Sequence, residues 1–191
     1  FVMLNMSIGI DNPGRGPIHI PNGISNHYPQ ARKWADSLWN AEILKDTFIY
    51  NEKGLRMHAF YATAPSQTSK TAIIVHGYTD NATGMLRLGH MYHHHLGYNI
   101  LLPDLHYSGL SDGDAFQMGW LDRKDVIQWM DTANCIFGKN TQMVVHGISM
   151  GAATTMMVSG ESQPEYVKCF IEDCGYTSVW DEFCHVFKRD Y

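Results

Sequence analysis

Between residues 71 and 173, short apolar runs alternate with longer stretches in which apolar and polar positions mix at helical spacing. The short runs predict buried strands, and the longer stretches predict helices. We expect strands at 71–76, 98–103, 141–146 and 166–173, separated by helices at 84–96, 121–137 and 150–160. This alternation favours an α/β fold with a mainly parallel sheet and helices on both faces.

The segment before this alternation has a different pattern. Two alternating runs, 46–50 and 55–62, flank the polar sequence Asn51-Glu52-Lys53-Gly54. They predict a hairpin, which would form the antiparallel edge of the sheet. Upstream of the hairpin, Trp34 and Leu38 stand near helical spacing with their apolar neighbours and predict a helix within 29–44.

Residues 1–30 are rich in Gly, Pro, Asn and His and predict an irregular arm. We therefore divide the chain into an N-terminal arm and helix at 1–44 and a main domain at 45–191. Residues 176–190 are expected to begin a further helix or a cap element.

The composition agrees with one folded domain. The chain has 191 residues, of which 45% are hydrophobic and 17% charged, as in a packed core rather than a disordered segment. A net charge of −5 without a basic cluster argues against nucleic acid as a partner. No apolar stretch reaches the 18 residues of a membrane span. The sequence begins Phe1-Val2-Met3-Leu4, which could be the tail of a longer apolar segment, so an upstream export signal or membrane anchor stays open.

Candidate chemistry first appears where the predicted strand at 141–146 ends. The sequence Gly147-Ile148-Ser149-Met150-Gly151 is a G-x-S-x-G motif between a strand and a helix. Such a sharp turn strains the serine backbone, and glycine is needed on either side to avoid clashes. It would present Ser149 as a nucleophile and aim the Met150 N–H at the reacting centre, where it would stabilise developing negative charge.

A second motif follows the predicted strand at 71–76, which ends in His76-Gly77-Tyr78. With the serine motif, it resembles the α/β-hydrolase superfamily, in which His-Gly-x follows the third strand and the N–H of x forms the other half of the oxyanion hole. The resemblance assigns that role to Tyr78. From the residues alone, Gly77 permits a tight turn that exposes the next amide as a donor.

The resemblance covers residues 45 to 185 and extends to the strand and loop between the two motifs. The strand ending at Asp104 and the glycine-rich loop 105–113 are similar to the fourth strand of the superfamily and the loop after it. His106 and Tyr107 depart from the commoner Arg-Gly there, and we assign them no catalytic role. Within the superfamily, the chain looks most similar to the monoglyceride-lipase and serine-aminopeptidase-like branch, often named cell-surface hydrolases.

The predicted sheet brings these motifs together. Sites in open α/β sheets form at the carboxyl ends of the strands. His76, Asp104, Ser149 and Asp173 all stand at such ends, so we expect four separate stretches to converge on one crevice.

The remaining triad members are not evident. A serine nucleophile needs a histidine base and an orienting acid, and in this superfamily they follow the serine in the order acid, then histidine. His185 is the one histidine after Ser149, and it lies in a predicted helix or cap. Asp173 is a candidate acid, with a turn-capping role as the alternative. We therefore expect the last strands, the acid and the base to lie downstream or on a second chain.

Two histidine features have simpler explanations. His93, His94 and His95 are consecutive, and consecutive helical residues point about 100° apart, so they are expected on a solvated helix face rather than around one metal ion. His146, within a predicted strand, is expected in the core.

Two classes of function stay open from the sequence. The first is a serine hydrolase that cleaves a carboxylic ester, thioester or amide of a small-molecule or acyl substrate, a route that needs no metal and no organic cofactor. The second is a non-catalytic α/β-hydrolase-fold protein that binds a ligand and lacks a general base.

Overall fold

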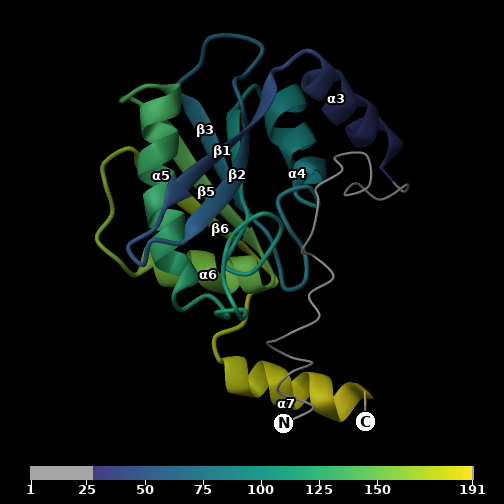
Figure 1. Cartoon of the computed structure of the whole chain (residues 1–191), viewed down its shortest axis with the longest axis vertical. Coiled ribbons are helices and arrows are strands. Elements are labelled where there is room, and N and C mark those ends of the chain that lie inside the picture. Colours follow the sequence, from purple (N-terminus) through teal and green to yellow (C-terminus); the bar gives the residue numbers. More distant parts are fainter. Residues whose placement is uncertain (1–27, 191) are drawn as a thin grey trace.

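The computed structural model describes residues 28–190 of the chain. Its strands are β1 (Leu44–Tyr50), β2 (Arg56–Ala62), β3 (Lys70–Val75), β4 (Asn99–Pro103), β5 (Gln142–Ile148) and β6 (Val167–Asp173). They form one sheet in the order β1-β2-β4-β3-β5-β6 (Figure 1). The predicted arm at 1–30 lies almost entirely outside the described residues.

The strand pairing confirms the predicted sheet. β1 and β2 form an antiparallel hairpin at one edge, and β2 also pairs antiparallel with β4. The pairs β3–β4, β3–β5 and β5–β6 are parallel. β3, β4, β5 and β6 therefore all point in the same direction. Their carboxyl ends lie at one end of the sheet, and the turn between β1 and β2 lies at that same end.

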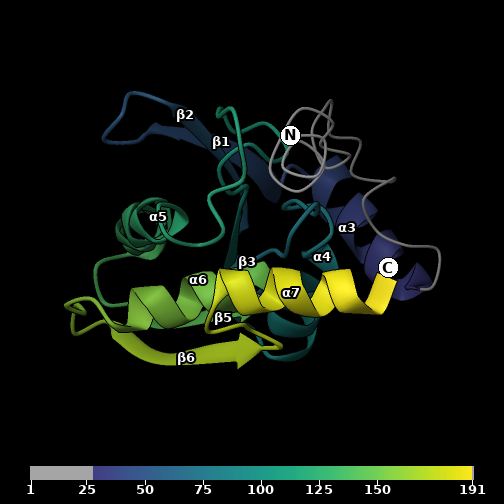
Figure 2. The same cartoon turned by 90° about the horizontal axis from the view of Figure 1, so that it is seen from below.

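Helices cover both faces, as predicted (Figure 2). The helices are α3 (Pro29–Asn40), α4 (Leu86–His90), the π-helical turn η1 (Met91–His95), α5 (Asp122–Phe137), α6 (Met150–Ser159) and α7 (Val179–Asp190). α3 and α4 lie on one face, and α5 and α6 on the other. α7 projects away from the sheet (Figure 1). No helix among residues 28–190 is long and apolar enough to cross a membrane.

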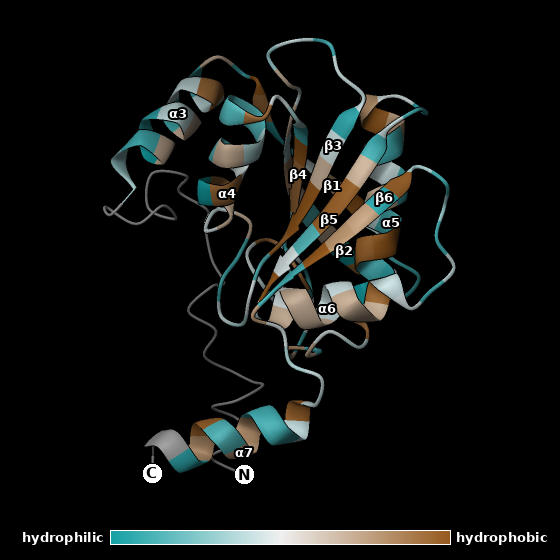
Figure 3. Ribbon diagram, turned by 180° about the vertical axis from the view of Figure 1, so that it is seen from behind, coloured by the Kyte–Doolittle hydropathy of each residue, from teal (hydrophilic) through white to brown (hydrophobic). Residues whose placement is uncertain are grey.

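The alternation of side chains along the strands divides the core into two layers. Ala72 and Ile74 of β3 pack with α3 and α4, whereas Ile73 and Val75 pack with α5 and α6. Both faces of the central strands are therefore apolar, and Figure 3 shows that hydrophobic residues predominate along these strands. This explains why these strands appear in the sequence as continuous apolar runs.

β6 has a different environment from the central strands. Five of its seven positions are exposed, including Ile171, which keeps 39% of its surface accessible. Its outer edge pairs with no other strand in the part of the chain that the structure describes. Such an edge presents unpaired backbone groups that would accept another strand.

The expectation of a solvated face for all three consecutive histidines is wrong for His93. The predicted helix at 84–96 ends in the π-helical turn η1, which places His93 in a buried position against α3. The His93 Nδ1 accepts a hydrogen bond from the Trp34 indole at 3.3 Å, and Nε2–H donates to the Thr63 carbonyl at 2.9 Å. His94 and His95 are exposed, as expected.

We expect the free energy of unfolding to fall as the pH falls below about 6.5, the usual pKa of an unfolded histidine. Burial lowers the pKa of His93, so the folded state binds this proton less tightly than the unfolded state. The stability that the neutral ring contributes is present above pH 6.5 and is lost as the pH falls through the lowered pKa. Urea unfolding at pH 7.5 and 5.0 measures the loss. His93→Gln, which can keep both hydrogen bonds without titrating, should lose less, and an equal loss in both proteins would contradict this origin.

Candidate active site

Ser149 forms the junction between β5 and α6. β5 ends at Ile148 and α6 begins at Met150, so the chain reverses at this single residue. Its backbone has φ 55° and ψ −115°, a conformation that non-glycine residues rarely adopt. The strand-to-helix turn predicted from the sequence is therefore present, and it leaves Ser149 exposed.

The two glycines of the motif are required by close approach of the backbone. A Cβ on Gly147 would lie 2.1 Å from the Gly151 carbonyl oxygen. A Cβ on Gly151 would lie 2.3 Å from the Val75 carbonyl oxygen. Both distances are far below van der Waals contact, so the first turn of α6 packs against β5 and the end of β3 only when both positions lack a side chain.

The loop after β3 lies directly beside Ser149. A Cβ on Gly77 would be 3.3 Å from the Ser149 Cβ and 3.9 Å from its Oγ. Tyr78, the next residue, is 37% exposed, and its ring packs on Phe116 with the centroids 4.7 Å apart. Burial raises the pKa of the Tyr78 phenol, so this side chain is neutral at physiological pH. The structure thus brings the two sequence motifs together.

Met150 is the first residue of the ten-residue helix α6. The first amides of a helix have no acceptor within the helix, and its dipole is positive at this end. The side chain of Met150 is buried in the core, so only its backbone faces the turn. Its amide and the loop of Tyr78 lie next to Ser149, where a developing oxyanion would need donors.

Strained backbone gathers at this edge of the sheet. Thr79 follows β3, Tyr107 follows β4, Ser149 follows β5 and Cys174 follows β6, and all four have positive φ between 55° and 63°. Residues in such conformations persist only where the surrounding structure holds them, and they are concentrated at functional sites. The carboxyl edge is therefore the part of the described chain in which function is most expected.

Two of the four residues predicted to converge on a crevice are instead fully buried. His76 and Asp104 have no accessible surface, so neither lines an open site. His76 Nδ1 lies 2.7 Å from the Gly77 carbonyl oxygen, and its Nε2 accepts a hydrogen bond from the Leu105 amide at 2.9 Å. The ring is therefore neutral with the proton on Nδ1, and it connects the loops that follow β3 and β4.

Asp104 pairs with a histidine that the sequence analysis did not identify. His58 of β2 is fully buried, and its Nδ1 lies 2.7 Å from Asp104 Oδ2. The sequence feature that could have indicated this pair is a histidine within an otherwise apolar part of β2. β2 pairs with β4, which Asp104 follows directly. No local pattern relates two residues that are 46 positions apart.

Neither the candidate acid nor the candidate base is hydrogen-bonded to the Ser149 side chain in the part of the chain that the structure describes. The Asp173 carbonyl accepts a hydrogen bond from the Ser149 amide at 2.8 Å, but its carboxylate is exposed and accepts one from Cys174 Sγ at 3.0 Å. His185 is exposed on α7. Within residues 28–190, no histidine ring is hydrogen-bonded to Ser149 Oγ.

His146 is buried, as expected from its place in a strand. Its Nδ1 is hydrogen-bonded to the Tyr92 hydroxyl at 3.0 Å, and burial lowers the pKa of the ring. Burial also raises the pKa of Tyr92 to about 12, so both groups are neutral and this pair belongs to the core.

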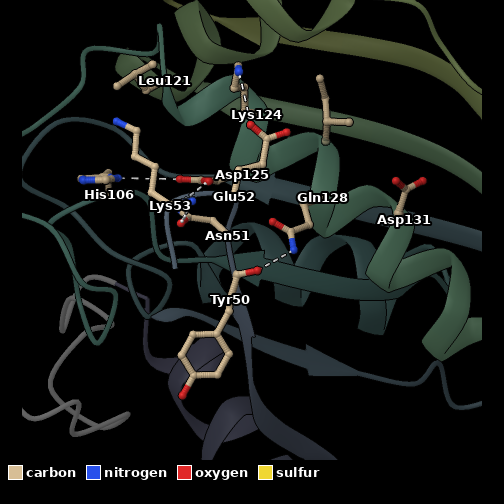
Figure 4. Close-up of a pocket in the computed structure, with 11 residues that line it drawn as sticks. Tyr50, Asn51, Glu52, Lys53, His106, Leu121, Lys124, Asp125, Gln128 and Asp131 are labelled. Carbon is tan, nitrogen blue, oxygen red and sulfur yellow. Dashed lines mark hydrogen bonds and ion pairs between the residues drawn. The ribbon is translucent and has the colours of Figure 1, made fainter. Parts of the chain in front are cut away.

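A cavity of about 410 Å³ lies at the same edge of the sheet, between the β1–β2 turn and α5 (Figure 4). Asn51 Nδ2 donates to Asp125 at 3.0 Å, and Gln128 donates to the Tyr50 carbonyl at 2.9 Å. Its polar groups thus largely pair with one another and fasten the hairpin to α5. Neither Ser149 nor Tyr78 lines this cavity.

Comparison with known proteins addresses the fold. No protein-family model matches the chain. YqkD of Bacillus subtilis (strain 168), an uncharacterized protein, is 26% identical over 151 residues, which are 79% of this chain and 47% of that protein. The esterase Pf2001 of Pyrococcus furiosus superposes with a TM-score of 0.68 at 22% identity, over 80% of this chain and 60% of that one. The chain has the α/β-hydrolase fold.

Other hydrolase structures agree with this fold at lower identity. An α/β serine hydrolase homologue from Coxiella burnetii superposes with a TM-score of 0.52 at 16% identity, over 60% of this chain and 56% of that one. An α/β hydrolase from Novosphingobium aromaticivorans gives 0.53 at 19% identity, over 67% of this chain and 43% of that one. The chain thus spans about two fifths to three fifths of the length of the proteins that it matches.

Proposed function

We propose that this chain is part of a serine hydrolase that cleaves a carboxylic ester, thioester or amide through an acyl-enzyme on Ser149. Ser149 Oγ bonds to the acyl carbon, the bond from that carbon to the leaving group breaks, and the serine proton passes through the base to the leaving group. Water then cleaves the bond between Ser149 Oγ and the acyl carbon and releases the acid. The Met150 and Tyr78 amides stabilise the oxyanion. The substrate we propose is a small-molecule or acyl compound that carries such a bond.

One observation carries the proposal. Ser149 is held in a strained conformation at the start of α6, with the loop of Tyr78 packed beside it through Gly77. A strained, exposed serine between two backbone-donor segments is costly for a protein that does not use it. The esterase Pf2001 shares this fold, which supports the same reaction class here.

We further propose that the histidine base comes from outside residues 28–190 or from a second chain, and that the acid is either Asp173 or a later residue. Three facts support this: the chain covers 60% of Pf2001, the outer edge of β6 is unpaired among the described residues, and no described histidine is bonded to Ser149. The monoglyceride-lipase and serine-aminopeptidase-like branch is the subgroup that we propose.

A fluorophosphonate probe tests the nucleophile directly. The purified native gene product is weighed intact, treated with the probe and weighed again, and the adduct is mapped by peptide sequencing. A single adduct on Ser149 is the expected result. A protein that stays unlabelled favours the alternative, a binding protein of the same fold. The supporting observation for it is that no histidine within residues 28–190 is bonded to Ser149.

We expect the isolated 191 residues to hydrolyse p-nitrophenyl esters far more slowly than the complete gene product. A serine without its base retains only the contribution of the oxyanion hole and of binding, so turnover should fall by roughly 10³-fold or more. Both polypeptides are assayed at equal concentration after circular dichroism has shown that they are folded. Equal turnover would refute the proposed origin of the base.

A further inference from the structure

The carboxylate of Asp104, which follows β4, is buried and accepts hydrogen bonds from several segments. Oδ1 accepts a hydrogen bond from the Ala82 amide at 2.7 Å. Oδ2 accepts one from the Leu110 amide at 2.9 Å and one from His58 Nδ1 at 2.7 Å. The loop turns closely around it, since a Cβ on Gly109 would lie 2.0 Å from Oδ2. The segments of His58, Ala82 and Leu110, the first two of them distant in sequence, are thus bonded to one side chain that substrate cannot reach.

Ala82 lies four residues after Tyr78, in the loop that runs from β3 to α4. The other end of this loop is held by the His76 ring, which bonds to the Gly77 carbonyl and to the Leu105 amide. A backbone bond from Asp80 N to the Gly77 carbonyl, at 3.3 Å, closes a turn between these two anchors. Tyr78 therefore lies in a short span that is fastened at both ends to the segment 104–105.

We propose that the buried Asp104–His58 pair is a positioning element that holds the loop of Tyr78 at the distance from Ser149 that oxyanion binding requires. This inference rests on the proposed function. Hydrogen bonds to a charged group are shorter and stronger than neutral ones, so a carboxylate fixes the Ala82 amide better than a neutral acceptor would. A misplacement of about 1 Å in a catalytic group can lower the rate roughly 100-fold.

His58 makes the buried carboxylate tolerable. A carboxylate without accessible surface is costly unless it is paired and hydrogen-bonded. The His58 ring is itself fixed between aromatic rings, with centroids 5.0 Å from Phe48 and 4.7 Å from Phe60. The N-terminal hairpin thus contributes to the site indirectly, through one side chain of β2.

The test is Asp104→Asn in the complete gene product. Asparagine keeps the shape of the side chain, but an NH2 group replaces one of the two carboxylate oxygens. This donor then faces a backbone amide that is also a donor, that of Ala82 or that of Leu110. We expect kcat for a p-nitrophenyl ester to fall roughly 10- to 100-fold with KM changed less than about threefold, because the loss arises in the transition state. Hydrogen exchange measured by mass spectrometry should become faster in the peptide covering 76–84.

Two further variants separate positioning from general destabilisation. His58→Gln retains a donor toward Asp104 and should keep more of kcat than His58→Leu, which retains none. Leu38→Ala removes a buried apolar side chain of α3 that takes no part in these hydrogen bonds, and it should weaken the fold without changing kcat or exchange at 76–84.

Hydrogen exchange at 76–84 and kcat together distinguish failure of the positioning role from failure of the proposed function. Unchanged exchange at 76–84 in Asp104→Asn overturns the positioning role, whatever the activity is. Faster exchange with a kcat equal to that of Leu38→Ala also overturns it. A wild-type protein with no turnover and no fluorophosphonate adduct overturns the proposed function instead, and faster exchange in Asp104→Asn would then still support the anchoring of this loop by Asp104.

Discussion

Replacing Ser149 by alanine in the complete gene product is expected to lower kcat for ester hydrolysis by roughly 10⁴- to 10⁶-fold, since no acyl-enzyme can form. The expected loss is this large because the other groups at the turn are backbone donors, which stabilise charge but cannot attack a carbonyl. The reaction is followed with a p-nitrophenyl ester, and labelling by the fluorophosphonate should disappear in parallel.

The fold should survive this substitution. Alanine differs from serine by the loss of an exposed hydroxyl, and both residues carry the same Cβ into the φ 55° conformation. The free energy of unfolding should therefore change by less than about 1 kcal/mol. Ser159→Ala, at the other end of α6, is the matched control, and its kcat should equal that of the wild type. Turnover by Ser149→Ala within tenfold of the wild type would exclude Ser149 as the nucleophile.

The strand and helix pattern was predictable because its periodicities are local. β3 and β5 are apolar on both faces, so each appears in the sequence as one run, and the hairpin of β1 and β2 is marked by the polar turn between its two strands. The turn at Ser149 was predictable because the glycines that its backbone requires stand two positions on either side. Such features need no knowledge of distant residues.

The interior of the site was not predictable in the same way. Parallel strands bring their carboxyl ends to one edge, but the pattern does not say which side chains there face solvent. His76 and Asp104 were expected to line a crevice, whereas they are buried beneath the loops because each bonds to backbone amides of a neighbouring segment. The pairing of Asp104 with His58, and the π-helical turn that buries His93, depend on contacts between segments far apart in the chain.

Gly147→Ala is expected to destabilise the folded protein by about 3 kcal/mol or more, at or beyond the upper end of ordinary overpacking. The new Cβ would lie 2.1 Å from the Gly151 carbonyl oxygen, and this oxygen belongs to the backbone of α6. It cannot rotate away as a flexible side chain would, so the helix must shift from β5. Urea unfolding followed by circular dichroism measures the change.

The matched control is Gly160→Ala, at the other end of the same helix. Gly160 has φ −78°, and the nearest atom to a new Cβ is 3.6 Å away, so alanine fits without strain. This variant should be stabilised by about 0.4–1 kcal/mol through the lower entropy of its unfolded chain. Equal stability of Gly147→Ala and the wild type would mean that α6 does not approach β5 this closely. Because Ser149→Ala should remove turnover while preserving the fold, and Gly147→Ala should damage the fold itself, the pair separates the chemistry of the turn from its architecture.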